Sequence, residues 1–186
     1  AYQLGLFHLN GICTEKDPIK AVELLTFAAD GGNISACDEL GNCYIQGIGV
    51  DLNYKNAAYY YKKAEAKNHA HSTLQLGKYH ELGVGVEKNI SKAWDLYKKA
   101  AEFGESEGYY HIGRLYENSK NYKYAKQYYT KAADLNNPLG LTALGELYEN
   151  KKGFTTKKYK EAIDCYQKAA DLNHPDAFYR LAKLYH

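Results

Sequence analysis

Residues 40–50, LGNCYIQGIGV, are the first stretch whose residue types could carry chemistry. A Gly-x-Gly run beside an apolar segment occurs in phosphate-binding loops. A dinucleotide site, however, needs a third glycine in G-x-G-x-x-G, and a P-loop needs Lys followed by Ser or Thr. Residues 47–52 have neither feature. We therefore expect that ATP and NAD do not bind and that the chain uses no cofactor.

Two histidines and four cysteines are the other candidates for catalysis or metal binding. His69 and His71 are two residues apart, whereas a helical metal pair is typically four apart, and no Cys or carboxylate joins them in the sequence. We expect them in a loop that starts a helix. No Ser/His/Asp or Cys/His set recurs, so we predict no catalytic residue, no metal site and no enzyme activity. Without a C-x-x-C pair, the cysteines are interpreted as small packing residues: Cys13, Cys37, Cys43 and Cys165.

The glycines recur at a nearly constant spacing, which indicates internal repeats. The stretch LGKYHELGVGV at residues 76–86 repeats the pattern of residues 40–50 after 36 positions. The first glycine of the motif falls at residues 5, 41, 77, 113 and 145, with Ala182 in the sixth position. A second motif recurs in step with it and reads KAWDLYKKAAEFG from Lys92. The chain therefore contains about five repeats of two motifs each.

Both motifs have the apolar spacing of an amphipathic helix. Ala93, Leu96 and Ala100 share one stripe of the second motif, and Ala36 and Leu40 share one stripe of the first. We predict about eleven helices, at least about two-thirds helical residues and no strand pairs. Each second motif ends at Gly or Asn, where a left-handed C-cap is expected: Gly31, Asn68, Gly104, Asn136 and Asn173.

The glycines of the first motif have two different predicted roles. Gly41 and its counterparts lie inside the first helix, where glycine costs about 1 kcal/mol relative to alanine. A glycine at this position in five repeats indicates that a partner helix leaves no room for a Cβ. Gly47 and Gly49 follow the helix and are predicted to turn the chain. Gly153, in the irregular turn of the fifth repeat, is expected to tolerate a side chain better.

The combined pattern is A-x-x-x-L-G-x-x-Y-x-x-G-x-G-V followed by K-A-x-x-x-Y-x-K-A-A. It extends from Ala36 to Ala64 in the second repeat and from Leu76 to Ala101 in the third. This pattern resembles the Sel1-like repeat, a relative of the tetratricopeptide repeat, over essentially the whole chain. The resemblance implies an all-α fold, a right-handed superhelical solenoid of stacked antiparallel helix pairs with about five repeats and a terminal helix.

Some repeats depart from the family pattern. His8 and His80 take its tyrosine position, and the fourth repeat lacks the Gly-x-Gly-Val turn. The last helix, 176–186, has no second helix after it, and the chain contains no methionine, so we expect one repeat domain from a longer protein.

The expected repeats are residues 1–32, 33–68, 69–104, 105–136 and 137–173, with a partial sixth at 174–186.

The signals for location and partner class are mixed. Some secreted relatives carry one disulfide per repeat, but the position that would pair with Cys37 holds alanine. Unpaired cysteines slightly favour the cytoplasm, whereas N-x-S sequons at residues 33–35 and 89–91 allow a secretory route. A net charge of +2 gives no case for nucleic acid. No apolar run approaches the about 20 residues of a membrane span, so we expect no membrane insertion.

A solenoid of helix pairs presents a concave face, which its first helices should line. On each first helix, the stripe opposite the packing stripe is expected to be free. It is mostly apolar in the first three repeats and mostly acidic later, so a bound peptide would place apolar residues and then a basic stretch against it. The candidate partner-binding residues are Leu6, Leu9, Asp38, Asn42, Ile45, Leu74, Lys78, Glu81, Leu82, Tyr110, Arg114, Glu117, Glu146 and Glu149.

The main functional hypothesis is a non-enzymatic scaffold or adaptor whose concave groove binds a protein or peptide segment. Leu74 and Tyr110 are its predicted anchors, and a small-molecule ligand is not expected. Two alternatives stay open, because Sel1-like repeats are known in each setting. One is a regulatory or activator domain attached to a catalytic module, and the other is a secreted bacterial effector or surface protein.

Overall fold

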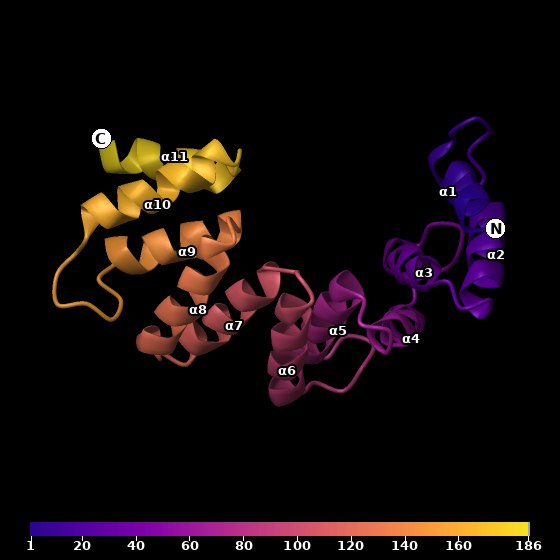
Figure 1. Cartoon of the computed structure of the whole chain (residues 1–186), viewed down its shortest axis with the longest axis horizontal. Helices are drawn as coiled ribbons and strands as arrows, with labels where there is room; N and C mark the ends of the chain where they lie inside the picture. The colour runs from indigo at the N-terminus through magenta and orange to yellow at the C-terminus, as the bar shows by residue number, and fades with distance from the viewer. Residues whose placement is uncertain (186) are drawn as a thin grey trace. The chain divides into compact units, whose positions relative to one another are not determined.

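The computed structural model describes residues 1–185, which form eleven α-helices and no strand (Figure 1). The expected all-α fold of stacked helix pairs with a terminal helix is confirmed. His186, which the sequence placed in the last helix, lies outside the described residues. The first helices of the repeats are α1 (Tyr2–Asn10), α3 (Ile34–Gln46), α5 (Ala70–Leu82), α7 (Glu107–Asn118), α9 (Pro138–Glu149) and α11 (Pro175–Tyr185). The second helices are α2 (Pro18–Asp30), α4 (Tyr54–Glu65), α6 (Ile90–Glu102), α8 (Tyr122–Asp134) and α10 (Tyr159–Asp171).

The helices divide into two compact units, each with its own core. The N-terminal unit, Ala1–Phe103, contains α1 to α6, and the C-terminal unit, which begins at Gly104, contains α7 to α11. Within each unit, a first helix packs on the second helix of its own repeat, and that second helix packs on the first helix of the next repeat. An interior first helix such as α5 is therefore covered on more than one side.

The glycine in the middle of each first helix lies directly against a large side chain of the second helix. A Cβ added at Gly41 would overlap ring atoms of Tyr61. This ring and its counterparts in the next three repeats have at most 1% of their surface exposed. The predicted packing role of these glycines is confirmed, because only glycine lets the ring approach so closely. The other pairs are Gly77 with Tyr97, Gly113 with Tyr129, and Gly145 with Tyr166.

The Gly-x-Gly turns connect the two helices of one repeat and pack against the preceding repeat. Gly49 has a φ of 69°, and a Cβ there would overlap the carbonyl group of Pro18, the first residue of α2. Gly85 lies in the same way against Tyr54, the first residue of α4. Each turn thus touches the second helix of the preceding repeat, and the predicted turn role is confirmed.

One expectation about the other glycines is wrong, and another is not tested. Gly31 has a φ of −74° and is not left-handed, because Gly32 adopts the positive φ of 86° in its place. Gly153 was expected to tolerate a side chain better than Gly41, and this ranking stays a prediction. Gly153 has a φ of 78°, and its Cβ would lie 2.8 Å from the Cβ of Tyr122, so a side chain there is strained as well. The other predicted left-handed residues, Asn68, Gly104, Asn136 and Asn173, do have positive φ.

The asparagines of both sequons begin helices. The side chain of Asn33 accepts a hydrogen bond of 2.8 Å from the backbone N–H of Ala36, and that of Asn89 accepts one of 2.9 Å from Lys92. Asparagine is among the preferred N-cap residues, since its side-chain oxygen satisfies an unpaired N–H of the first turn. Helix capping therefore accounts for asparagine at both positions.

Gly41→Ala is expected to destabilise the protein by about 1–3 kcal/mol, because the new methyl group overlaps a buried ring. Gly5→Ala is the matched control at the same repeat position. Its Cβ would meet the branched side chain of Leu25, with the nearest atom at 3.1 Å, and the change gains about 1 kcal/mol of helix propensity. Urea unfolding should show a clear loss for Gly41→Ala and little change for Gly5→Ala; equal losses would contradict the packing role.

Candidate interaction surfaces

The first helices form the inner side of each unit. α3 packs on α5 and α7 packs on α9, whereas the second helices of neighbouring repeats do not pack on one another to this extent. In a stack of helix pairs, the helices that converge lie on the inside of the curve. This packing agrees with the expectation that the first helices line the concave side, and we call their face the inner side and that of the second helices the outer side.

Two candidate residues are buried between neighbouring helices. Asp38 and Leu74 both lie three residues before a repeat glycine, and only 8% and 1% of their surfaces are exposed. The prediction that they belong to a free stripe is wrong, because each interior first helix packs against its first-helix neighbour as well as against second helices. Leu74→Ala would therefore leave a cavity in the core and would not test a binding anchor.

Asp38 of α3 is held by residues of α5 in the next repeat. Its carboxylate lies 2.9 Å from Nδ1 of His71 and accepts a hydrogen bond of 2.5 Å from the hydroxyl of Ser72. Burial alone would raise the pKa of Asp38, but the hydrogen bonds from His71 and Ser72 outweigh burial and lower it. The polar cluster thus fastens α3 to α5.

His69 and His71 both lie beside a carboxylate, which was not expected from the sequence. Nδ1 of His69 lies 3.6 Å from Asp38, which the sequence could not place there because it belongs to another repeat. His69 is the N-cap of α5, as expected, and its ring accepts a hydrogen bond from the backbone N–H of Ser72. The expectation is wrong for His71, which lies inside α5. Within residues 1–185 no group of three or more His, Cys, Asp or Glu side chains is arranged to hold a metal ion.

Carboxylates four residues after the repeat glycine accept hydrogen bonds from the buried tyrosines. Each of these tyrosines lies over the glycine of its repeat, so its hydroxyl reaches the next turn of the first helix. These glutamates were expected on the free stripe, but one of their oxygens is committed to the repeat core. The pairs are Tyr97 with Glu81 at 2.5 Å, Tyr129 with Glu117 at 2.6 Å, and Tyr166 with Glu149 at 2.7 Å.

The first two repeats replace this glutamate with apolar residues. In the second repeat the position holds Ile45, and Tyr61 donates its hydroxyl hydrogen bond of 2.7 Å to Asn42 instead. In the first repeat the position holds Leu9, which packs against the core cluster that contains Leu25. Leu25 replaces the tyrosine and needs no acceptor. Leu9 and Ile45 are therefore partly buried packing residues, not free apolar anchors.

The acidic residues of the C-terminal unit have basic partners. Nζ of Lys152 lies 2.7 Å from Glu117, and the guanidinium group of Arg180 lies 2.5 Å from Glu146 and 4.0 Å from Glu149. Burial raises the pKa of Glu146, although Arg180 opposes this effect. The negative charge expected to attract a basic peptide is thus largely balanced within the unit.

The residue that follows each repeat glycine is half-exposed on the inner side. Tyr110 is half-exposed as well, and it stacks on the buried Tyr129 with 5.9 Å between the ring centroids. Leu82, at the end of α5, has 66% of its surface exposed. These side chains are the accessible part of the predicted stripe. The residues after the glycine are Leu6, Asn42, Lys78, Arg114 and Glu146.

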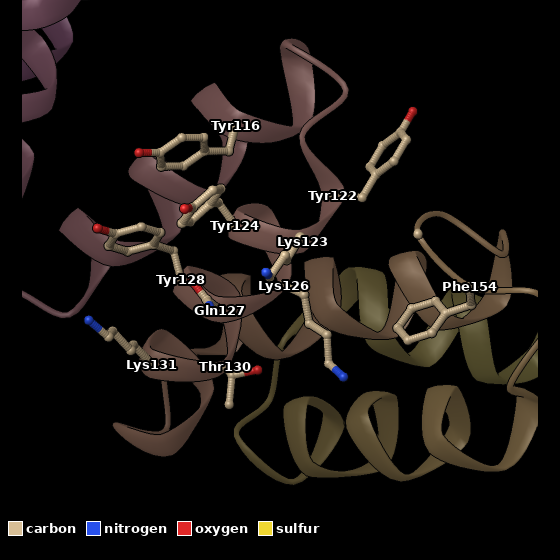
Figure 2. Close-up of a pocket in the computed structure, with 11 residues that line it drawn as sticks. Tyr116, Tyr122, Lys123, Tyr124, Lys126, Gln127, Tyr128, Thr130, Lys131 and Phe154 are labelled. Carbon is tan, nitrogen blue, oxygen red and sulfur yellow. The ribbon is translucent and has the colours of Figure 1, made fainter.

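An open hollow of about 790 Å³ lies over α8 on the outer side of the C-terminal unit (Figure 2). It extends from the end of α7 across α8 to the loop between α9 and α10. The sequence alone does not reveal it, because the Tyr and Lys residues of YKYAKQYYTK resemble an ordinary solvated helix face. We call it the α8 hollow. It is lined by the rings of Tyr116, Tyr122, Tyr124, Tyr128 and Phe154 and by Lys123, Lys126 and Lys131, among others.

A second hollow, of about 480 Å³, lies between α4 and α6 in the N-terminal unit. Its lining mixes charges of both signs, and Lys99 forms an ion pair with Glu65 across it. Leu76 and Leu96 contribute apolar surface. Each unit thus has a hollow beside its second helices, and of these two only the α8 hollow has a single sign of charge in its lining.

The cysteines are free thiols, and three of the four are buried. Burial raises the pKa of Cys43 and of Cys165 to about 11, so both remain protonated at neutral pH. The interpretation as small packing residues is confirmed for these two and for Cys37. It is wrong for Cys13, which is exposed.

Family models match the repeats directly. The model of the Sel1 repeat matches residues 1–33, 34–69, 70–104 and 138–174. The chain belongs to the Sel1 repeat family. A tetratricopeptide repeat model matches residues 106–138, which contain the repeat without the Gly-x-Gly-Val turn.

Several solved structures have the same fold. A Sel1 repeat protein from Oxalobacter formigenes is 28% identical, with a TM-score of 0.90 over 100% of this chain and 75% of that chain. The c5321 protein, a protective antigen present in uropathogenic Escherichia coli strains, is 26% identical, with a TM-score of 0.85 over 99% of this chain and 40% of that chain. The immunity protein Pa5087 from Pseudomonas aeruginosa is 24% identical and shares the fold with a TM-score of 0.60, over 90% of this chain and 63% of that chain. No curated protein matches the chain.

Sel1 and tetratricopeptide repeats generally act as protein-interaction scaffolds and are typically non-catalytic. This Sel1 repeat chain has the accessible helix faces that such a role requires. None of its described helices combines the length and the apolar character needed to cross a membrane.

Asp38→Asn is expected to destabilise the protein by about 1–2 kcal/mol at neutral pH, because hydrogen bonds to a charged acceptor are stronger than neutral ones. Folding lowers the pKa of Asp38, so its carboxylate stabilises the folded state above the unfolded pKa of about 3.9. That contribution is lost as the pH falls through the folded pKa. Urea unfolding of both proteins between neutral and acidic pH should show the difference shrinking; a constant difference would refute this role.

Proposed function

We propose that this chain is a non-enzymatic scaffold or adaptor that binds a segment of a partner protein on the inner face of its first helices. The proposal keeps the accessible candidates and omits Asp38 and Leu74, which belong to the core. The contacts in the N-terminal unit would come from Leu6, Asn42, Lys78 and Leu82, and those in the C-terminal unit from Tyr110, Arg114 and Glu146.

The observation that supports this proposal most strongly is the variation at the residue after the repeat glycine. It changes from Leu6 to Asn42 to Lys78 in the N-terminal unit and from Arg114 to Glu146 in the C-terminal unit. By contrast, the residue directly before the repeat glycine is Leu or Ile in all five repeats. Each repeat thus offers a different contact on the same backbone, which suits recognition of an irregular peptide along a stack of repeats.

Tyr110 and Leu82 are the proposed anchors. Aromatic and well-buried apolar contacts usually carry most of the affinity of an interface, and rim charges carry little. Tyr110 is already held by its stacking on Tyr129, so binding would cost it little conformational freedom. The surrounding charges, including Arg114 and Glu146, would mainly set the orientation of the partner and its rate of association.

The likeness to the protective antigen of uropathogenic Escherichia coli favours a second candidate, a bacterial surface or secreted protein. This chain spans 40% of that protein. The second candidate changes the compartment in which binding takes place, but it uses the same helix face.

Site-specific photo-crosslinking tests the proposed face. A photo-reactive amino acid at Leu82 or Tyr110, in cells that make the chain, should give adducts of defined mass with a partner protein. Phe27 is the matched control, because it is 75% exposed against 66% for Leu82 but lies on the second helix α2. The same adducts from Phe27, or none from either first-helix position, would show that the face is wrong.

Tyr110→Ala should then weaken binding of the captured partner by about 1–2 kcal/mol. Its stacking contact makes a folding control necessary, so thermal melting of the variant is compared with that of the wild type. Unchanged affinity in a folded variant would remove Tyr110 from the interface.

A further inference from the structure

We propose that the α8 hollow is a second interaction site, which binds an acidic segment of a partner protein. It lies on the outer side of the C-terminal unit and shares no lining residue with the proposed first-helix site. The geometry of its lysines and rings carries the proposal, which is independent of the function proposed above.

The hollow has the size and the shape of a docking site for a short segment. It is an open depression of about 790 Å³. Tyr116, Tyr124 and Tyr128 gather on one side, Phe154 lies on the other side, and Lys126 lies between them (Figure 2). Apolar ring surface and cationic groups are therefore within reach of one bound chain.

The electrostatic character of the hollow points to an anionic ligand. No carboxylate lines it, and Lys123, Lys126 and Lys131 have no carboxylate partner among the described residues. Two lysines of the same unit do have one, since Lys152 pairs with Glu117 and Lys158 pairs with Glu161. The hollow is distinguished by gathering three lysines in a lining that contains no carboxylate.

Two of these lysines are held in place by aromatic rings. Nζ of Lys126 lies 5.1 Å from the ring centroid of Phe154, and Nζ of Lys131 lies 5.0 Å from that of Tyr128. A cation over a ring face is attracted by the ring quadrupole, which restricts the flexible side chain. The two lysine side chains therefore lose less conformational entropy when an anion binds, because the rings already restrict them.

The ring geometry favours carboxylates over nucleic-acid bases. Tyr116 stacks on both Tyr124 and Tyr128, with 5.2 Å and 5.5 Å between the ring centroids and interplanar angles of 26° and 14°. Single-stranded nucleic acid binds such sites by stacking bases on open ring faces. Here tyrosines cover one another, and lysines cover Tyr128 and Phe154. Three of the five rings in the lining are thus engaged with one another, which leaves fewer open ring faces for base stacking.

The hydroxyl groups are suitable donors at neutral pH. Burial raises the pKa of Tyr128, and the neighbouring tyrosines raise it further, so its hydroxyl stays protonated. Thr130 and Gln127 add donors along α8. Asp and Glu side chains accept from both hydroxyl and ammonium groups, so a peptide with several carboxylates matches the hollow better than a neutral one.

Panning a random peptide library against the whole chain tests this proposal. Peptides rich in Asp and Glu should be enriched, and the enrichment should disappear with the double variant Lys126→Glu/Lys131→Glu. The matched control is Lys160→Glu/Lys168→Glu, which changes the same charge at exposed positions of α10 outside the hollow. It should recover the same acidic peptides as the wild type.

A selected acidic peptide should bind the wild type at least about tenfold more tightly than the Lys126→Glu/Lys131→Glu variant, and added salt should weaken it. Lys126→Gln/Lys131→Gln gives the same comparison without charge reversal, and melting curves show that each variant folds. Leu82→Ala should leave this affinity unchanged, so the result is separate from the first-helix proposal.

Three results would overturn the proposal. The first is a selection without acidic enrichment. The second is an equal loss of binding in the α10 control variant. The third is a single-stranded thymidine oligonucleotide that binds more tightly than the peptide and depends on the same lysines, which would assign the hollow to nucleic acid.

Discussion

The close contact between a glycine of the first helix and a tyrosine ring of the second is the interaction on which the other features depend. Because Gly41 has no side chain, the ring of Tyr61 lies directly against α3 and is fully buried. The ring also carries a hydroxyl group to the next turn of the first helix, where an acceptor must be present. In most repeats that acceptor is a glutamate such as Glu149, and in the second it is Asn42. One packing contact thus determines both the helix pair and the identity of the polar residues beside the inner face.

The curvature within each unit divides the surface into two kinds of site. Convergence of the first helices buries residues such as Leu74 and leaves a narrow accessible column after the glycines. Hollows lie beside the second helices, between α4 and α6 in one unit and over α8 in the other. The inner column varies in chemistry from repeat to repeat, whereas the α8 hollow concentrates cations and rings in one place. A scaffold with both could hold two different segments at once.

Local patterns allowed much of the fold to be predicted from the sequence. The helices follow from apolar spacing, and the roles of Gly41 and Gly49 follow from the cost of glycine in a helix and from turn chemistry. The candidate site was predicted less well, because exposure depends on neighbouring repeats. The sequence does not show that Asp38 meets His71 and Ser72 from the next repeat, or that Glu117 accepts a tyrosine hydroxyl bond. The α8 hollow depends on how the end of α7, α8 and the loop after α9 lie together, which no spacing in the sequence expresses.

A double-mutant cycle between Gly41 and Tyr61 tests the central claim most directly. The first repeat uses Leu25 opposite Gly5, so Tyr61→Leu should create space for a methyl group at Gly41. We predict that the cost of Gly41→Ala, measured by urea unfolding, falls by about 1 kcal/mol or more in the Tyr61→Leu background, since contacting residues are energetically coupled. The same cost in both backgrounds would contradict the account, because it would mean that the glycine is not there to accommodate the ring.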